Sequence, residues 1–278
     1  AAPDRPEAWD AQGEVELAAG RLDEAEASFR RALDLAADFT SPYDGLAAIA
    51  FHRGDLHGGI AQLQAGLHAT TAVTPPGARI RLLEQLGEAQ MIVGQEQAAF
   101  DAIARSVEAQ GLQDAPVVEA VTHLGRARLL WRTKRWTRAR TEALAAREGA
   151  PPPFVRWVST ALEASLGALA GDGSAAASAL DDVRQGIGHD HPLTLEPAFY
   201  VAIANDRLDE AAAALLQLDT VAPYRSDEAR LALAHAMVAA QRNDEARALL
   251  TVVSRRYRRS VSSAVVRREA TAMLETLA

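Results

Sequence analysis

Several residue types are absent or scarce in this sequence, and each absence narrows the class of protein. The 278 residues include no cysteine, which excludes disulfides, thiolate metal sites and a cysteine nucleophile. Aromatic residues make up only 5% of the chain, and β-branched residues, which favour strands, are also few. Apolar residues make up 49% of the chain and are dominated by alanine. Because alanine is the strongest helix former, the composition predicts an all-α protein.

Long apolar runs and an excess of basic charge are also missing. No run approaches the roughly 20 apolar residues that a membrane-spanning helix needs, and no signal peptide is present. The net charge of −8 argues against nucleic acid as the default partner, because phosphate binding needs a cationic surface. Peripheral association with a membrane or a membrane-bound complex stays open.

The use of basic residues and the start of the chain bear on its origin. Lys134 is the single lysine, and arginine takes the other basic positions, which with the abundant alanine is typical of GC-rich, bacterial coding. The sequence begins Ala1-Ala2-Pro3-Asp4. Such a start fits either the end left by signal-peptide cleavage or an arbitrary boundary, so cytoplasmic and periplasmic or exported locations both stay open.

A pattern of small and apolar residues recurs along the chain at steps of 34 to 40 residues. In the first copy, Trp9 to Leu33, it reads as two amphipathic helices joined by a turn at Gly20. Ala25 takes the place where the second helix approaches the first, and its equivalents are Gly59, Ala99, Ala139, Ala176, Ala211 and Ala246. The turn position is filled in order by Gly20, Gly54, Gly94, Lys134, Gly171, Asp206 and Gln241. Each copy therefore predicts a helix A, a short turn and a helix B.

The first copies resemble the tetratricopeptide repeat (TPR) family, whose 34-residue unit carries W-x2-L-G-x2-Y and then Ala, Phe, Ala and Pro. The matching residues of copy one are Trp9, Gly13, Ala25, Phe29 and Ala32. Gln12, Glu16 and Ala37 stand where the family has Leu, Tyr and Pro. Later copies keep the spacing and lose most of the signature.

This resemblance implies an all-α fold: a right-handed superhelical α-solenoid of about seven TPR-like helix-turn-helix repeats, forming one domain over residues 1–278. The expected repeats are 6–38, 40–73, 78–112, 115–149, 152–187, 192–222 and 225–258. A capping helix over 260–277 should cover the last pair with residues such as Val261 and Ala264. The glycine-rich breaks at 171–174 and 185–192 are either flexible joints or plain inter-helix loops.

Motifs of known enzyme classes are missing from the sequence. It has no phosphate-binding GxxxxGK[ST], no HExxH and no GxSxG. His189, Asp190 and His191 form the best metal candidate, but alternating ligands in a loop point to different sides, and the sequence favours a solvated loop with Asp190 as a helix cap before Pro192. We expect no catalytic residues, no metal site and no cofactor.

In the TPR family, helix A lines the concave side of the superhelix, so the resemblance suggests partner-binding residues there. The acidic candidates are Glu7, Asp10, Glu14, Asp44, Glu84 and Glu88; the basic and aromatic ones are Arg128, Trp131, Arg132 and Tyr200. Acidic residues in the N-terminal half would attract a basic segment, whereas the Arg–Trp group would anchor a carboxylate or an apolar side chain. The alternatives are helix faces charged for solubility, and a Trp131 packed between helices.

A dense basic run, Arg255–Arg259, lies near the C-terminus. It could bind phosphate, an acidic protein or a membrane surface, or its side chains could point into water and interact with a helix dipole. The sequence as a whole predicts a non-catalytic scaffold that binds a protein or peptide segment in its groove or docks into a larger assembly. Two alternatives stay open: a peptide-sensing regulatory module of a longer signalling protein, and a structural subunit of an envelope complex.

Overall fold

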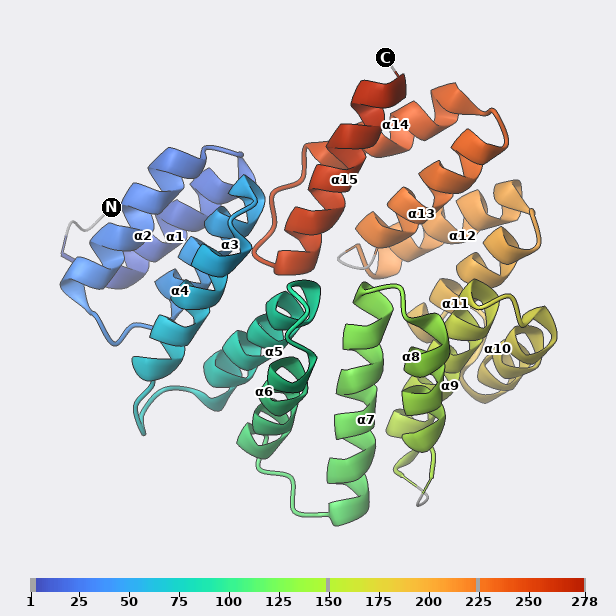
Figure 1. The fold of residues 1–278 in the computed structure, drawn as a ribbon, viewed down its shortest axis with the longest axis horizontal. Helices are drawn as coiled ribbons and strands as arrows, with labels where there is room; N and C mark the ends of the chain where they lie inside the picture. Colours follow the sequence, from blue (N-terminus) through green and yellow to red (C-terminus); the bar gives the residue numbers. More distant parts are fainter. Residues whose placement is uncertain (1–3, 149–150, 224–225, 278) are drawn as a thin grey trace. The chain divides into compact units, whose positions relative to one another are not determined.

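The computed structural model describes residues 4–148, 151–223 and 226–277. These residues form fifteen α-helices and no strand (Figure 1), which confirms the all-α class. Three positions used above lie outside the described residues: the start of the chain at Ala1, the end of the fourth expected repeat at Gly149, and the start of the seventh at Arg225.

The helices follow one another in the order expected for A and B partners. They are α1 (Pro6–Ala18), α2 (Leu22–Leu35), α3 (Ser41–Arg53), α4 (Leu56–His68), α5 (Pro76–Ile92), α6 (Glu96–Ala109), α7 (Ala115–Arg132), α8 (Trp136–Ala145), α9 (Pro153–Leu169), α10 (Gly173–Ile187), α11 (Pro192–Ala204), α12 (Leu208–Val221), α13 (Ser226–Ala239), α14 (Asn243–Ser254) and α15 (Val261–Leu277). Apart from α5, which begins at Pro76, each helix lies within its expected range. The number of repeats and the handedness of the superhelix stay predictions.

A residue in the left-handed region follows each A helix from α1 to α13. These residues are Gly20, Gly54, Gly94, Lys134, Gly171, Asp206 and Gln241, with φ between 58° and 88°. The next N–H donates to the carbonyl five residues back, at 2.8–3.0 Å, as in a Schellman C-cap. The turn position seen in the sequence is therefore the residue that must adopt positive φ, which glycine does without strain.

Two glycines of the A helices α1 and α3 make room for one aromatic ring of the B helix α2. A Cβ at Gly13 of α1 would lie 2.7 Å from Phe29 Cε1, and one at Gly45 of α3 would lie 2.5 Å from Phe29 Cε2. Phe29, on α2, is fully buried. The glycines therefore let one ring fill the space against both A helices.

The departures from the TPR signature in the first repeat form a polar contact of their own. Glu16 is buried and accepts hydrogen bonds from Ser28 Oγ at 2.6 Å and Gln12 Nε2 at 2.8 Å. Glutamate at the tyrosine position and glutamine at the leucine position therefore compensate each other, because a buried carboxylate needs hydrogen-bond donors.

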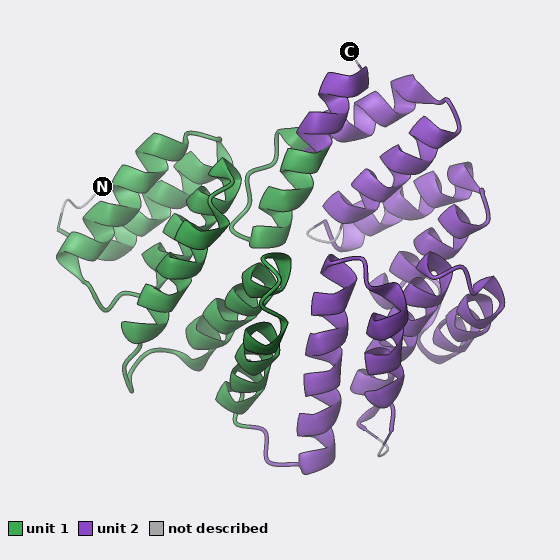
Figure 2. Cartoon of the chain, viewed as in Figure 1, with its two compact units in different colours: residues 1–111, 254–269 green, residues 112–253, 270–278 purple. Residues whose placement is uncertain are grey.

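The chain divides into two compact units (Figure 2). Unit 1 comprises residues 1–111 and 254–269, and unit 2 comprises 112–253 and 270–278. Both glycine-rich breaks named above, 171–174 and 185–192, lie inside unit 2, so neither separates the units. The single domain over 1–278 stays a prediction, and each unit is described by itself.

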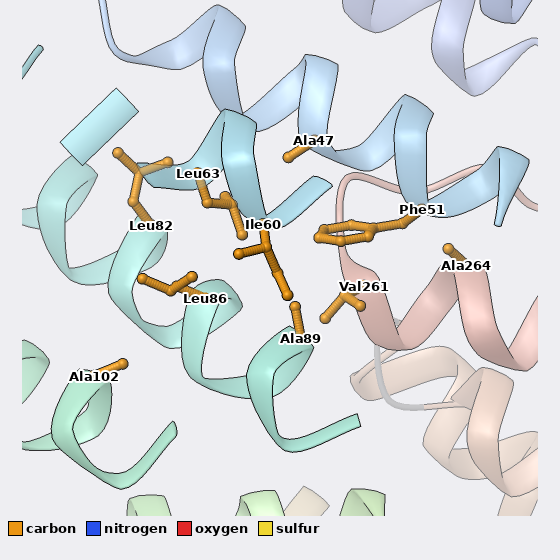
Figure 3. Packing of buried hydrophobic residues seen from close by; sticks show 10 residues of the cluster. All are labelled: Ala47, Phe51, Ile60, Leu63, Leu82, Leu86, Ala89, Ala102, Val261 and Ala264. Atoms are coloured by element: carbon orange, nitrogen blue, oxygen red, sulfur yellow. The ribbon is translucent and has the colours of Figure 1, made fainter. Parts of the chain in front are cut away.

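The first half of α15 packs differently from what the sequence led us to expect. Val261 and Ala264 are fully buried in unit 1 (Figure 3) rather than against the last helix pair. Their cluster comprises Ala47, Phe51, Ile60, Leu63, Leu82, Leu86, Ala89 and Ala102. The helices α3–α6 thus offer these two residues an apolar site, and the cover of α13 and α14 by the rest of α15 stays a prediction. None of the described helices is long and apolar enough to cross a membrane.

Candidate functional site

Three acidic residues of the A helices of unit 1 surround one arginine from the C-terminal segment, residues 254–269. Asp10 Oδ1 lies 3.3 Å from Arg259 Nη2, and Asp44 Oδ2 lies 3.5 Å from Arg259 Nε. Glu14 forms a further ion pair with Arg259. These carboxylates come from α1 and α3, so the fold gathers them around the guanidinium.

The guanidinium of Arg259 makes further contacts with α2 and α3. Its guanidinium carbon lies 5.2 Å from the centre of the Phe29 ring, within range of a cation–π interaction. Nη1 lies 3.2 Å from Ser41 Oγ, and Nη2 donates to the Ser41 carbonyl. Because the Arg259 side chain is only 15% exposed, this arginine is an anchor and not a solvated charge.

Two side chains of unit 1 bind the main chain of the C-terminal segment. Gln85 on α5 donates from Nε2 to the Arg259 carbonyl at 3.1 Å and accepts from the Val261 N–H at 3.0 Å. His52 on α3 lies with Nε2 2.8 Å from the Arg258 carbonyl. Residues 256–258 are not helical, so these bonds hold an irregular stretch in the way a peptide is held.

A second cation of the C-terminal segment, Arg267 of α15, contacts His52 of α3. Its Nε donates to His52 Nδ1 at 3.1 Å and its Nη2 donates to the His52 carbonyl at 2.9 Å. The guanidinium stacks 4.4 Å from the centre of the Tyr257 ring, which itself lies 5.0 Å from the His52 ring. Because Nδ1 accepts a hydrogen bond, His52 is neutral and carries its hydrogen on Nε2.

Burial shifts the pKa values of the groups in this site. Burial raises the pKa of Asp44, and the Arg259 and Arg81 charges partly offset that rise. Arg81 Nε lies 3.0 Å from Asp44 Oδ2. Burial likewise raises the pKa of Glu14, and it lowers that of His52 to about 4. The site therefore contains a carboxylate without solvent access, which requires cations beside it.

The other acidic candidates lie elsewhere on the A helices. Glu7 is exposed, with its Oε2 3.6 Å from Arg5 Nε. Glu84 is exposed and Glu88 half-buried on α5. The structure thus brings three of the six acidic candidates together and leaves the binding role of all six as a prediction.

Sequence reasoning placed His52 on the A-helix face but missed Gln85, the main-chain bonds of both residues, and the position of the basic run against the acidic face. Gln85 and His52 carry no motif that marks them in a single sequence. The opposite charges of the acidic A-helix residues and the Arg255–Arg259 run were the signal that could have linked the two features.

Unit 2 has a pocket of about 290 Å³ on its A helices. Its lining residues are Arg128, Trp131 and Arg132 of α7, Val158, Ala161, Leu162 and Ser165 of α9, Leu193 and Glu196 of α11, and Glu228 of α13. The lining combines apolar side chains with charges of both signs. The structure thus brings together the three α7 residues that the sequence singled out.

The aromatic part of this site is packed. Trp131 is 8% exposed, with its ring 6.2 Å from Trp136 and 5.1 Å from Tyr200, both edge to face. Tyr200 is buried, and burial raises the pKa of its hydroxyl. Arg128 is exposed, and Arg132 forms an ion pair with Glu228. Trp131 is therefore both a packing residue and a wall of the pocket.

The loop before α11 differs in detail from the expectation. His191, not Asp190, is the N-cap, and its Nδ1 accepts from the Leu193 N–H at 3.1 Å. A ring nitrogen two residues before that N–H reaches it directly, so the predicted Asp190 cap was wrong. His189 and Asp190 line a pocket of about 530 Å³. No three histidine, aspartate or glutamate side chains come together as metal ligands in the part of the chain that the structure describes.

Comparison with known proteins shows the fold. No protein-family model and no curated protein sequence matches the chain. A Rap protein solved with competence and sporulation factor superposes with a TM-score of 0.54 at 10% identity, over 97% of this chain and 75% of that one. A tetratricopeptide repeat protein from Parabacteroides merdae gives 0.47 at 12% identity, over 96% and 98%. PilF of Pseudomonas aeruginosa gives 0.45 at 17%, over 78% and 92%. The chain has a TPR-like α-solenoid fold.

Proposed function

We propose that the protein is a non-catalytic scaffold that holds protein segments on its A-helix faces. The observation that carries this proposal is the face of unit 1, which already holds an irregular stretch of polypeptide. Gln85 and His52 of this face form hydrogen bonds with the main chain of the stretch, and Asp10 of the face pairs with its enclosed side chain, Arg259. These are the means by which a protein recognises a peptide.

The pocket of unit 2 is the site we assign to a partner. Arg128 and Arg132 offer guanidinium groups for a carboxylate, and Trp131, over the buried Tyr200, offers a rigid aromatic wall for an apolar side chain. Because α7, α9, α11 and α13 fix these groups before binding, the receptor loses little conformational entropy when the partner binds.

The test is affinity capture with chemical cross-linking on the full chain, using Arg128→Glu and a matched control, Arg138→Glu. Both arginines are exposed, but Arg138 lies on the B helix α8. Arg128→Glu should lose the partners that cross-link to α7–α13, by about tenfold or more, while Arg138→Glu keeps them. Equal recovery by wild type and both variants would remove the pocket as the partner site.

A peptide-sensing regulatory role is the second candidate. It is favoured by the occupation of the unit 1 face by the chain itself, because a bound segment that can be displaced gives a binding site two states. The Rap protein solved with a bound factor has the same fold. Under this candidate, a partner segment would alter which residues cover the unit 1 face.

A further inference from the structure

We infer that the A-helix face of unit 1 is a binding site for a basic segment of a partner protein, and that the chain's own residues 257–267 occupy this site as an internal competitor. We call this face the acidic groove and define it by Asp10, Glu14, Asp44, His52 and Gln85. The inference rests on the proposed scaffold function and names the chemical class of one partner.

The first argument is the charge of the acidic groove. Asp44 is fully buried, and its two cationic neighbours are Arg81 and Arg259. Without Arg259, three carboxylates would share one arginine of the groove itself, and removing a partner from a buried ion pair is strongly unfavourable. Any other occupant must therefore bring a cation, and the Phe29 ring face favours a planar guanidinium over an ammonium.

The second argument is that much of the binding is independent of side-chain identity. Gln85 contacts the carbonyl of residue 259 and the N–H of residue 261, and His52 contacts the carbonyl of residue 258. Asp44 Oδ1 accepts from Gln85 Nε2 at 2.6 Å and so fixes the orientation of the amide. A segment from another protein has the same main-chain groups and could form the same three bonds.

The third argument is the spacing of the anchors on either side of Arg259. Tyr257 packs over the turn at Gly20, where a Cβ would lie 2.9 Å from its Cε2. Val261 is completely buried in the apolar cluster of α3–α6 (Figure 3). The groove therefore selects an aromatic residue, an arginine two positions later and a small apolar residue two positions after that.

The internal segment also sets the conditions for exchange. A tethered segment acts at an effective concentration of about millimolar, so a partner segment must bind tightly or be held at a second site as well. The acidic groove should therefore bind a free peptide weakly while the internal segment is intact and strongly when that segment is weakened.

The test measures fluorescence anisotropy with a labelled synthetic peptide of residues 254–269 added to the full chain. Arg259→Ala weakens the internal segment and leaves the acidic groove unchanged; Arg255→Ala, at an exposed position of the same run, is the matched control. The full chain with Arg259→Ala should bind the wild-type peptide at least tenfold more tightly than the wild-type chain or the chain with Arg255→Ala. The same peptide carrying Arg259→Glu should not bind to any of them.

Tyr257→Ala is the second weakened variant and should act in the same direction. Both variants are checked for wild-type helicity by circular dichroism. If both keep that helicity and gain no affinity, or if both unfold, residues 257–267 are a permanent part of unit 1 and the inference is wrong. Light scattering adds one more outcome. If either variant forms dimers and the peptide dissociates them, the occupant of the acidic groove is a second copy of this chain, and the inference of a partner protein is wrong. Because the scaffold proposal is tested at Arg128 in unit 2, either proposal can fail without the other.

Discussion

Acidification should destabilise unit 1 through His52. This histidine is 4% exposed, and burial lowers its pKa from 6.5 to about 4. The protonated ring would also lose the hydrogen bond that Nδ1 accepts from Arg267 and would face that guanidinium as a like charge. In the unfolded chain the ring protonates near its ordinary pKa of about 6.5. The stabilisation is therefore complete above pH 6.5, declines as the pH falls toward 4, and is lost below it.

The size of the effect follows from the difference between the two pKa values. A shift from 6.5 to about 4 corresponds to a loss of about 3 kcal/mol between neutral pH and pH 4, at about 1.4 kcal/mol per unit. Asp44 and Glu14 have raised pKa values. Their protonation therefore acts in the opposite direction and favours the folded state as the pH falls. A difference between two variants is needed to isolate His52.

The matched variant is His52→Gln, whose amide can donate to the Arg258 carbonyl and accept from Arg267 without titrating. Urea unfolding of both chains, followed by circular dichroism from pH 8 to pH 4, gives the difference in unfolding free energy. We expect wild type to lose about 3 kcal/mol relative to His52→Gln over this range, mostly between pH 6.5 and 4. If the difference in unfolding free energy between wild type and His52→Gln does not change with pH, His52 is not buried in its neutral form.

Three further predictions concern the helix pairs. Gln241→Gly should raise the unfolding free energy by about 1 kcal/mol in urea titrations, because Gln241 has φ 63° and glycine removes that strain; Gln241→Ala should give no such gain. Gly59→Ala should lower the thermal midpoint, at a cost of about 1–3 kcal/mol, because its Cβ would lie 2.1 Å from Phe51 Cε1. Gly77→Ala, with nothing within 4 Å of the added Cβ, should be neutral or stabilising by up to about 1 kcal/mol in the same assay; a loss as large as that of Gly59→Ala would contradict the packing argument.

Local features of the fold could be predicted from the sequence because their causes lie within one repeat. Gly20 and its equivalents mark turns that need positive φ, and the small residues at positions such as Gly13 mark where rings enter. Even the non-glycine turn residues, such as Gln241, could be located by spacing alone. Helix order and approximate bounds follow from these signals.

The candidate site could be predicted only in part because its contacts join distant parts of the chain. Asp10, Glu14 and Asp44 were found as acidic A-helix residues, and Arg128 with Trp131 as a group on α7. The contact of His52 with Arg258 spans 206 residues, and no local pattern indicates it. For the same reason the sequence placed Val261 against the last helix pair.

The measurement that tests the central claim most directly is limited digestion with trypsin, read by mass spectrometry. Trypsin cleaves after Arg258 and Arg259, whose carbonyls accept hydrogen bonds from His52 and Gln85. In the wild-type chain these two bonds should be cut at least about 100-fold more slowly than in the free peptide of residues 254–269, since cleavage requires the segment to leave the groove.

The double variant Asp10→Asn with Glu14→Gln should restore rapid cleavage at these two bonds while helicity by circular dichroism is retained. Cleavage of the wild-type chain after Arg258 and Arg259 at the rate of the free peptide would show that the C-terminal segment does not occupy the acidic groove.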